Sequence, residues 1–360
     1  MTRARLLLAC LAGIAFQAFW YGPALASSTG RGVNDFLNFY TAGKLAFSGH
    51  LYDPQTFIAT EASVTGYSTA NLIFVRLPWQ AALFWLLARL PYFPAYAVWQ
   101  LLCVSALFAA FYLWPYGSRQ SKLLAAAWSF PLFTSLAVGQ DVPFVLLAIS
   151  AAVRFRERYP VLCGICQALC VAKVHLLWIF VLVWLGWDSK PRLAAFLSTG
   201  GVLAGLCFAA GTWNWIPQFL GALRFCEQHE DLSVMPNLHR IFAAAPTLEG
   251  IAALVCAAAV FLAARKDRSL AAAAALAAGI LTGRHGFIAD CSILLPAAGL
   301  VAVRVPEARK ALLLILVPLT YLPSFFAQPL ATTLVIASLC FGSAYAALTF
   351  RGPEKNEAMR

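Results

Sequence analysis

Polar and charged residues that could do chemistry stand at the ends of long apolar stretches in this chain. They are Asp35, Arg76, Gln140, Asp141, Lys173, His175, Arg284, His285 and Asp290. A positioned carboxylate or imidazole can act as a general base, and a fixed cation can stabilise negative charge that develops in a transition state. The residue types therefore indicate a site with one base and several anion-binding groups.

The elements that must position these residues are predicted by the composition. Of the 360 residues, 61% are hydrophobic and only 11% are charged, whereas soluble domains carry about 25% charged residues. This excludes a soluble cytoplasmic enzyme. The apolar blocks are about 20 residues long, which is the length that spans a bilayer as a helix. We therefore expect an all-α, polytopic helical integral membrane protein.

The net charge of +11 follows from the expected topology. Eighteen of the 26 Lys and Arg residues fall at helix ends that we assign to the cytoplasmic side, in agreement with the positive-inside rule. The remaining residues are close to charge balance. The basic character therefore gives no reason to expect a nucleic-acid partner.

About 12 transmembrane helices are expected, with both termini in the cytoplasm. The predicted domain is a single transmembrane domain over residues 1–350, followed by a cytoplasmic tail over 351–360. The stretch from Leu6 to Trp20 also fits a cleavable signal peptide, and we interpret it as an uncleaved first helix. The other predicted spans are 94–114, 123–138, 142–153, two short helices within 160–188, 193–211, 247–264, 269–284, 287–303, 311–326 and 330–350.

Two segments are predicted to lie outside the membrane on the outer side. The first covers residues 27–93 and includes a short helix at the membrane surface over 78–90; the second covers 212–246. The two short helices within 160–188 should meet near Lys173 and His175. In this topology all the polar clusters face the outer side, so they could share one site.

Several motifs, in their order along residues 30–300, resemble those of glycosyltransferase family 87. These motifs are Asp35–Tyr40 with Ala42-Gly43, Leu51-Tyr52-Asp53, the proline-led stretch after Phe74, Gly139-Gln140, the turn at Lys173, Met235-Pro236-Asn237-Leu238, and Arg284-His285 with Asp290. Members of that family have the GT-C fold and are typified by mycobacterial mannosyltransferases that use polyprenyl-phosphate sugars.

The resemblance implies a membrane glycosyltransferase that moves a sugar, with mannose favoured, from a polyprenyl-phosphate donor to a lipid or glycan acceptor with inversion. The protein would lie in the plasma (inner) membrane, among membrane lipids, with its active site on the periplasmic or outer face. No metal and no cofactor are expected. By resemblance, His285 belongs to the active site, either on the acceptor or beside the base.

The residues themselves suggest how such a reaction would run. A lipid phosphate leaves without the protonating acid that a glycosidase needs, so a single base suffices, and Asp35 is the candidate. Lys173, Arg284 and Arg76 could stabilise the departing phosphate, with His175, His285 and Gln140 as hydrogen-bond donors. Tyr40, with Phe36 and Phe39, would suit a sugar face.

Each of these residues also has a simpler interpretation. Asp35 could cap a helix, Lys173 could extend to the outer surface, and His285 could be a packed histidine. Asp290 could pair with Arg284 or cap the tenth predicted span, 287–303. Asp141 could simply be the residue at which the fourth predicted span, 142–153, begins.

A second class of function is also compatible with buried charges and broken helices, namely a flippase or transporter of lipid-linked sugars. We see no internal repeat of the kind that such proteins contain. The polar clusters also gather at one membrane surface instead of the midplane. Two histidines of the second outer loop, His229 and His239, stand near acidic residues, but their loose spacing favours solvent exposure over a metal site.

Overall fold

The computed structural model describes residues 2–32, 34–67, 73–186, 188–229, 231–315, 318–325 and 328–349. These residues form α-helices and short 3₁₀ helices, and no strand is found among them. The chain packs as two compact units. Unit 1 contains residues 1–174 and 187–232, and unit 2 contains 175–186 and 233–360. The predicted tail, 351–360, lies outside the described residues.

Unit 1 combines long apolar helices with a group of short ones. Its helices are α1 (Arg3–Gly30), α2 (Asp35–Leu45), α3 (Pro54–Thr65), α4 (Pro78–Leu87), α5 (Tyr92–Leu113), α6 (Arg119–Trp128), α7 (Phe130–Ala137), α8 (Val142–Phe155), α9 (Pro160–Leu169), α11 (Lys190–Gly211) and α12 (Trp215–His229). A 3₁₀ turn, Cys170–Lys173, follows α9.

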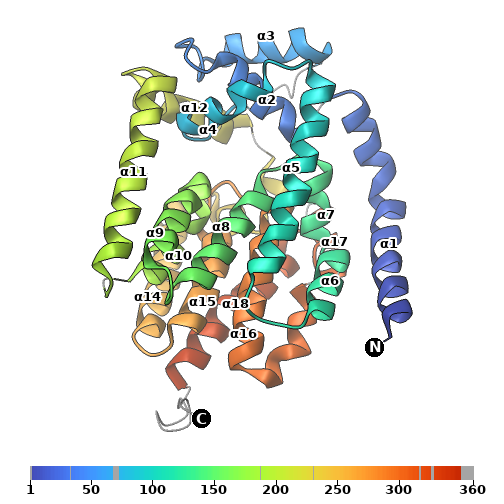
Figure 1. The fold of residues 1–360 in the computed structure, drawn as a ribbon, viewed down its shortest axis with the longest axis vertical. Coiled ribbons are helices and arrows are strands. Elements are labelled where there is room, and N and C mark those ends of the chain that lie inside the picture. The colour runs from blue at the N-terminus through green and yellow to red at the C-terminus, as the bar shows by residue number, and fades with distance from the viewer. Residues whose placement is uncertain are drawn as a thin grey trace. The chain divides into compact units, whose positions relative to one another are not determined.

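The short helices α2, α3, α4 and α12 gather at one end of unit 1, where α5 begins and α11 ends (Figure 1). We call these four helices the short-helix layer. Local signals set their boundaries: Asn34 caps α2, Asp53 caps α3, and Pro78 is the first residue of α4. Gly66, with φ of 76°, ends α3 in the left-handed conformation that glycine tolerates.

An aromatic core fixes α2 against α4 and α5. Phe36 and Phe39 of α2 are almost fully buried, and the Phe39 ring stacks on Phe84 of α4 with centroids 4.9 Å apart. Trp99 of α5 lies edge-on to Phe84 at 4.8 Å. Gly43 permits the close approach of α2 and α4, because a Cβ at this position would lie 2.5 Å from the carbonyl oxygen of Phe84.

The long helices of unit 1 pack in pairs. Helix α8 lies against α5 and α9, and α9 lies against α11. Gly164 brings α9 onto α11, since a Cβ there would stand 2.2 Å from the carbonyl oxygen of Arg192. Helix α1 packs on α6, where the buried Gln17 amide donates to the carbonyl oxygen of Ala127 at 2.7 Å.

Unit 2 has the small-residue helix α15 as its buried centre. Helices α14, α16 and α18 pack around it, and every residue from Leu270 to Leu281 is buried. The helices of this unit are α10 (Val174–Leu185, which begins at the last residue of unit 1), α13 (Leu238–Phe242), α14 (Pro246–Ala264), α15 (Arg268–Thr282), α16 (Leu294–Arg304), α17 (Leu322–Phe325) and α18 (Leu330–Thr349). The 3₁₀ helix η3 (Ile288–Ile293) precedes α16.

Six segments of the described residues are long and apolar enough to cross a membrane. They are Arg3–Pro23, Tyr92–Leu113, Pro160–Leu185, Lys190–Gly211, Pro246–Ala264 and Leu330–Thr349. Val142–Phe155 and Arg268–Thr282 are apolar but shorter. These findings fit a multi-pass membrane protein, whereas the expected number of about 12 spans is not confirmed.

Prolines explain where the sequence-based spans fail. The predicted span 123–138 is divided at Ser129, which ends α6 and caps α7 through its hydroxyl, with Pro131 in the first turn of α7. In the predicted span 311–326, the described residues form only 3₁₀ turns and the four-residue helix α17, around Pro318 and Pro323. Proline removes a backbone donor and clashes with the preceding turn, so a continuous helix is not formed.

We expect Gly43→Ala to lower the free energy of unfolding by about 1–3 kcal/mol, the usual cost of overpacking a tight contact. The added Cβ would meet the Phe84 backbone at 2.5 Å, which would separate α2 from α4. Thermal unfolding in detergent measures this change. Gly205→Ala in α11 is the matched control, because its Cβ would meet nothing within 4 Å. Equal melting temperatures for the two variants would contradict the tight contact.

Candidate active site

Asp35 is the first residue of α2, and the capping role falls to its neighbour. The side chain of Asn34 accepts a hydrogen bond from the Leu37 amide and so caps the helix. The Asp35 carboxylate instead accepts a hydrogen bond from the Gln140 amide nitrogen, with 2.6 Å between Nε2 and Oδ2. The capping interpretation of Asp35 is therefore wrong, because its carboxylate pairs with Gln140 and not with the helix amides.

A glycine turn brings Gln140 to Asp35. Gly139 has φ of +75°, a conformation that side chains disfavour. A Cβ on it would also lie 3.0 Å from the Cβ of Phe36. Two hydrogen bonds hold the turn. The Asp35 amide donates to the carbonyl oxygen of Val138 at 2.9 Å, and the Trp99 indole donates to the carbonyl oxygen of Gly139 at 2.8 Å.

Gln140 connects the carboxylate to a buried cation. Its side-chain oxygen accepts a hydrogen bond from the Lys173 ammonium at 3.3 Å, while its nitrogen donates to Asp35. Lys173 is fully buried, so it does not extend to the surface as the snorkelling interpretation required. The amide thus holds one group that can accept a proton and one that can attract an anion.

Asp141 is the counter-ion of this site. Its Oδ1 lies 3.2 Å from the Lys173 ammonium and 3.6 Å from the Arg76 guanidinium. The residue stands at the start of α8, as expected, but no capping hydrogen bond from its side chain occurs among the described residues. Sequence reasoning missed its ion pairs, for which the only local signal was its position beside Gln140.

Arg76 retains a donor for an additional anion. Its side chain is 7% exposed, and its Nη1 has no hydrogen-bond partner among the described residues. Buried donors are normally satisfied, so Nη1 could donate to a ligand on the side of Arg76 that does not face Asp141. The Tyr52 hydroxyl donates to the Arg76 carbonyl oxygen at 2.6 Å. Gln80 donates to the carbonyl oxygen of Ala172 at 2.9 Å, which positions the backbone before Lys173.

Tyr40 has a packing role. It is 3% exposed, its hydroxyl donates to the carbonyl oxygen of Leu90 at 2.7 Å, and its ring meets Tyr92 edge-on. Phe36 and Phe39 belong to the same core. The sugar face expected from these three side chains is therefore replaced by a core that supports α2.

In unit 2 the predicted residues form a second cluster. The His175 and His285 rings meet edge-to-face with centroids 6.0 Å apart, and His285 also contacts Phe287 at 5.0 Å. Asp290 accepts a hydrogen bond from the Phe287 amide at 3.0 Å and so caps η3. This confirms the simpler interpretation of Asp290.

Asn237 positions the corner that contains Arg284 and His285. It is fully buried; its oxygen caps α13, and its nitrogen donates to the carbonyl oxygen of Gly283 at 2.8 Å. Arg284 itself is more than half exposed and lies 3.7 Å from the Glu249 carboxylate. His239 is 3.0 Å from the same carboxylate. The His239 side chain is only 16% exposed, so the solvent exposure expected of it is wrong.

Across the part of the chain that the structure describes, no group of three or more His, Cys, Asp or Glu side chains is placed to hold a metal ion. Among the residues described in unit 1, the groups suited to proton transfer and to anion binding are the Asp35 carboxylate and the Lys173 and Arg76 cations.

Comparison with known protein families identifies a match over most of the chain. The model of glycosyltransferase family 87 matches residues 74–289, which include Arg76, Gln140, Lys173 and His285. No curated protein and no solved structure matches the chain significantly.

We expect Asp141→Asn to lower the free energy of unfolding by about 3 kcal/mol or more, the usual scale when one partner of a buried ion pair is removed. Lys173 and Arg76 would both lose the carboxylate that faces them. Thermal or denaturant unfolding in detergent tests this. Glu157→Gln is the control, since that carboxylate is 88% exposed where it meets Arg156 and exposed pairs contribute about 0–1 kcal/mol. Similar effects of both changes would refute the buried-pair assignment.

Proposed function

The chain belongs to glycosyltransferase family 87 and is a membrane glycosyltransferase, and from this premise we propose that it transfers a hexose from a polyprenyl-phosphate donor. Mannose is the favoured sugar, and a lipid or a glycan is the acceptor. The observation that carries the proposal is the Gln140 amide, which joins the Asp35 carboxylate to the Lys173 ammonium.

The reaction follows from the chemistry of these groups. The acceptor hydroxyl oxygen attacks C1 of the donor sugar from the face opposite the phosphate, and Asp35 takes its proton. The bond between C1 and the phosphate oxygen breaks, and the polyprenyl phosphate leaves with the bonding electron pair. Attack from the opposite face inverts the configuration at C1.

Lys173 and Arg76 would bind the phosphate and stabilise the charge that it gains as the bond breaks. Asp141 holds both cations in place when no donor is bound. The two cations and the carboxylates of Asp35 and Asp141 balance one another in charge. We infer that this balance keeps the released phosphate from being held too tightly.

Gln140 would act as a positioning residue. Its nitrogen donates to Asp35 and so orients the carboxylate that would take the acceptor proton; its oxygen orients Lys173. This links the base to the phosphate-binding group through a single side chain, so that proton removal and bond cleavage occur with fixed geometry.

His285, His175 and Arg284 enter the proposal through the family resemblance. We propose that His285 serves the reaction, either on the acceptor or beside the base, and that His175 and Arg284 contribute to donor binding. The proposed site faces the periplasmic or outer side of the plasma membrane, where a lipid-borne donor enters from the bilayer.

For Asp35→Asn we expect transfer to fall by about 10² or more, the usual effect of losing a positioned general base. Asn keeps the size of the side chain and an oxygen that can accept from Gln140, so folding and donor binding should persist. Lys173→Ala should weaken donor binding as well as the rate. Transfer from a radiolabelled polyprenyl-phosphate sugar measures the rate, and equilibrium binding of the same donor measures its affinity.

Asn34→Asp is the matched control, because it retains the cap of α2 and leaves Asp35 unchanged. It should turn over nearly as fast as the natural protein. Near-normal turnover of a well-folded Asp35→Asn variant would remove Asp35 from the mechanism.

The outer location that we propose for the short-helix layer predicts a labelling pattern. Ser63 on α3 and Gln228 on α12 are both exposed, and single cysteines at these positions should react with a membrane-impermeant thiol reagent in intact cells. A cysteine at Arg265, in a predicted cytoplasmic loop, should react only after the membrane is permeabilised. Protection of both outer positions in intact cells would overturn the proposed orientation.

A further inference from the structure

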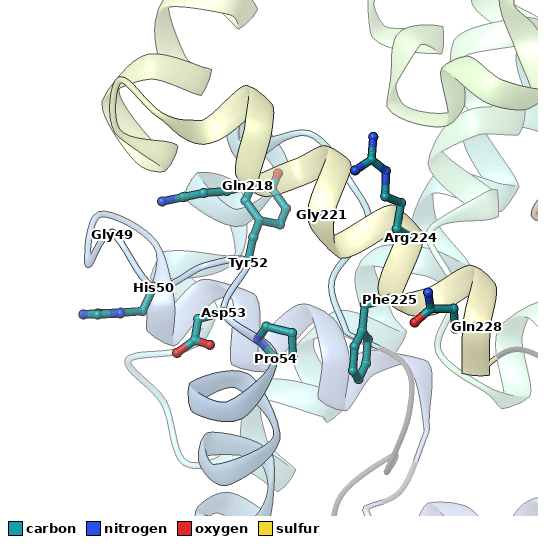
Figure 2. A pocket seen from close by; sticks show the side chains of 10 residues that line it. All are labelled: Gly49, His50, Tyr52, Asp53, Pro54, Gln218, Gly221, Arg224, Phe225 and Gln228. Carbon is teal, nitrogen blue, oxygen red and sulfur yellow. The ribbon is translucent and has the colours of Figure 1, made fainter.

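A pocket of about 620 Å³ lies in the short-helix layer, between α12 and the loop over residues 49–54 (Figure 2). Its volume is in the range of about 300–1,000 Å³ that is usual for ligand sites. None of its lining residues takes part in the proposed transfer step. The pocket is therefore a separate feature that the candidate active site does not explain.

One face of α12 forms a wall of the pocket. Gln218, Gly221, Phe225 and Gln228 follow one another at intervals of three or four residues, so they share one side of the helix. The two glutamines are about 15 Å apart along the helix. Gly221 keeps the middle of this wall open, because a Cβ there would meet nothing within 4 Å.

The opposite wall is a tight loop that presents His50 and Asp53, as Figure 2 shows. Gly49 has φ of +82°, which permits the turn before His50. Hydrogen bonds from the Thr56 side chain and amide keep the pKa of Asp53 below its ordinary value, so Asp53 is a carboxylate at neutral pH. Arg224 also lines the pocket and is always charged.

We propose that this pocket binds the uncharged oligosaccharide portion of the acceptor, a proposal that rests on the transfer function proposed above. The amides of Gln218 and Gln228 both donate and accept, the Asp53 carboxylate accepts, and the Arg224 guanidinium donates. Sugar hydroxyls, which also donate and accept, are matched by this set. The Phe225 ring, which stacks on His229 with centroids 4.3 Å apart, supplies the apolar part of the lining for the carbon-bound hydrogens of a sugar.

The charge of the lining residues and the length of the α12 wall favour a neutral oligosaccharide over a phosphate, a sulfate or a single small headgroup. One arginine and one aspartate leave no excess cation in the pocket, whereas a phosphate or sulfate ligand needs one. Polar side chains at both ends of a groove about 15 Å long fit a ligand that carries hydroxyls along its whole length. An oligosaccharide has this property and a single small headgroup does not.

The pocket is connected to the candidate active site through Tyr52. This residue lines the pocket, and its hydroxyl donates to the carbonyl oxygen of Arg76 at 2.6 Å. The Arg76 guanidinium in turn faces Asp141. The pocket therefore lies in the same unit as Asp35 and shares Tyr52 with the backbone that carries Arg76.

Binding of a neutral mannose trisaccharide to the purified, full-length protein in nanodiscs tests the proposal. We expect a Kd below about 5 mM, and an increase of about tenfold or more for Gly221→Phe, because the new ring would fill the groove. Gly205→Phe on α11 is the matched control, since its Cβ would also meet nothing, and it should bind normally. Gln218→Ala combined with Gln228→Ala tests the same site without added bulk.

The outcomes separate the pocket from the transfer function. Asp35→Asn should bind the trisaccharide normally, and Gly221→Phe should raise the KM for a glycan acceptor with little change in kcat. Failure of the natural protein to bind, unchanged binding in both pocket variants, or tighter binding of a sulfated trisaccharide would each overturn the proposal. Full transfer by Asp35→Asn would overturn only the proposed mechanism.

Discussion

The Gln140 side chain is the constraint on which the candidate site depends. A single amide orients both the Asp35 carboxylate and the Lys173 ammonium, two charges that would each be costly to bury without a partner. Its position in turn requires the left-handed Gly139 turn and the backbone hydrogen bond from Asp35 to Val138. The geometry of the candidate site is therefore set mainly by backbone conformation at one turn.

The buried charges explain why this region of unit 1 is so strongly supported. Lys173 and Arg76 share the Asp141 carboxylate, and Tyr52 and Gln80 hold the neighbouring backbone carbonyl groups. The aromatic core of α2, α4 and α5 holds the start of α2 against the turn. Tyr40 contributes to this support as a core residue, which shows how a motif residue can serve a site without lining it.

Much of the fold class could be predicted from the sequence, because apolar length and composition limit a chain of this kind to membrane helices. The long helices α5, α11, α14 and α18 lie within a few residues of the predicted spans. The two spans expected within 160–188 instead form one candidate span, Pro160–Leu185. The other failures occur around Ser129, Pro318 and Pro323, where hydropathy is high but proline interrupts hydrogen bonding. Hydropathy measures whether a segment can enter lipid, and it does not measure whether the segment can form one continuous helix.

The sequence by itself determined the helical membrane class, the family motifs and the identity of the groups that could do chemistry. The tertiary structure decided which of them are partners. Gln140 is 105 residues from Asp35 and 33 from Lys173, and no local pattern specifies contacts across such separations. The tertiary structure likewise assigned the counter-ion role to Asp141 and the pocket wall to α12. These assignments depend on side-chain packing between distant segments, which only folding brings together.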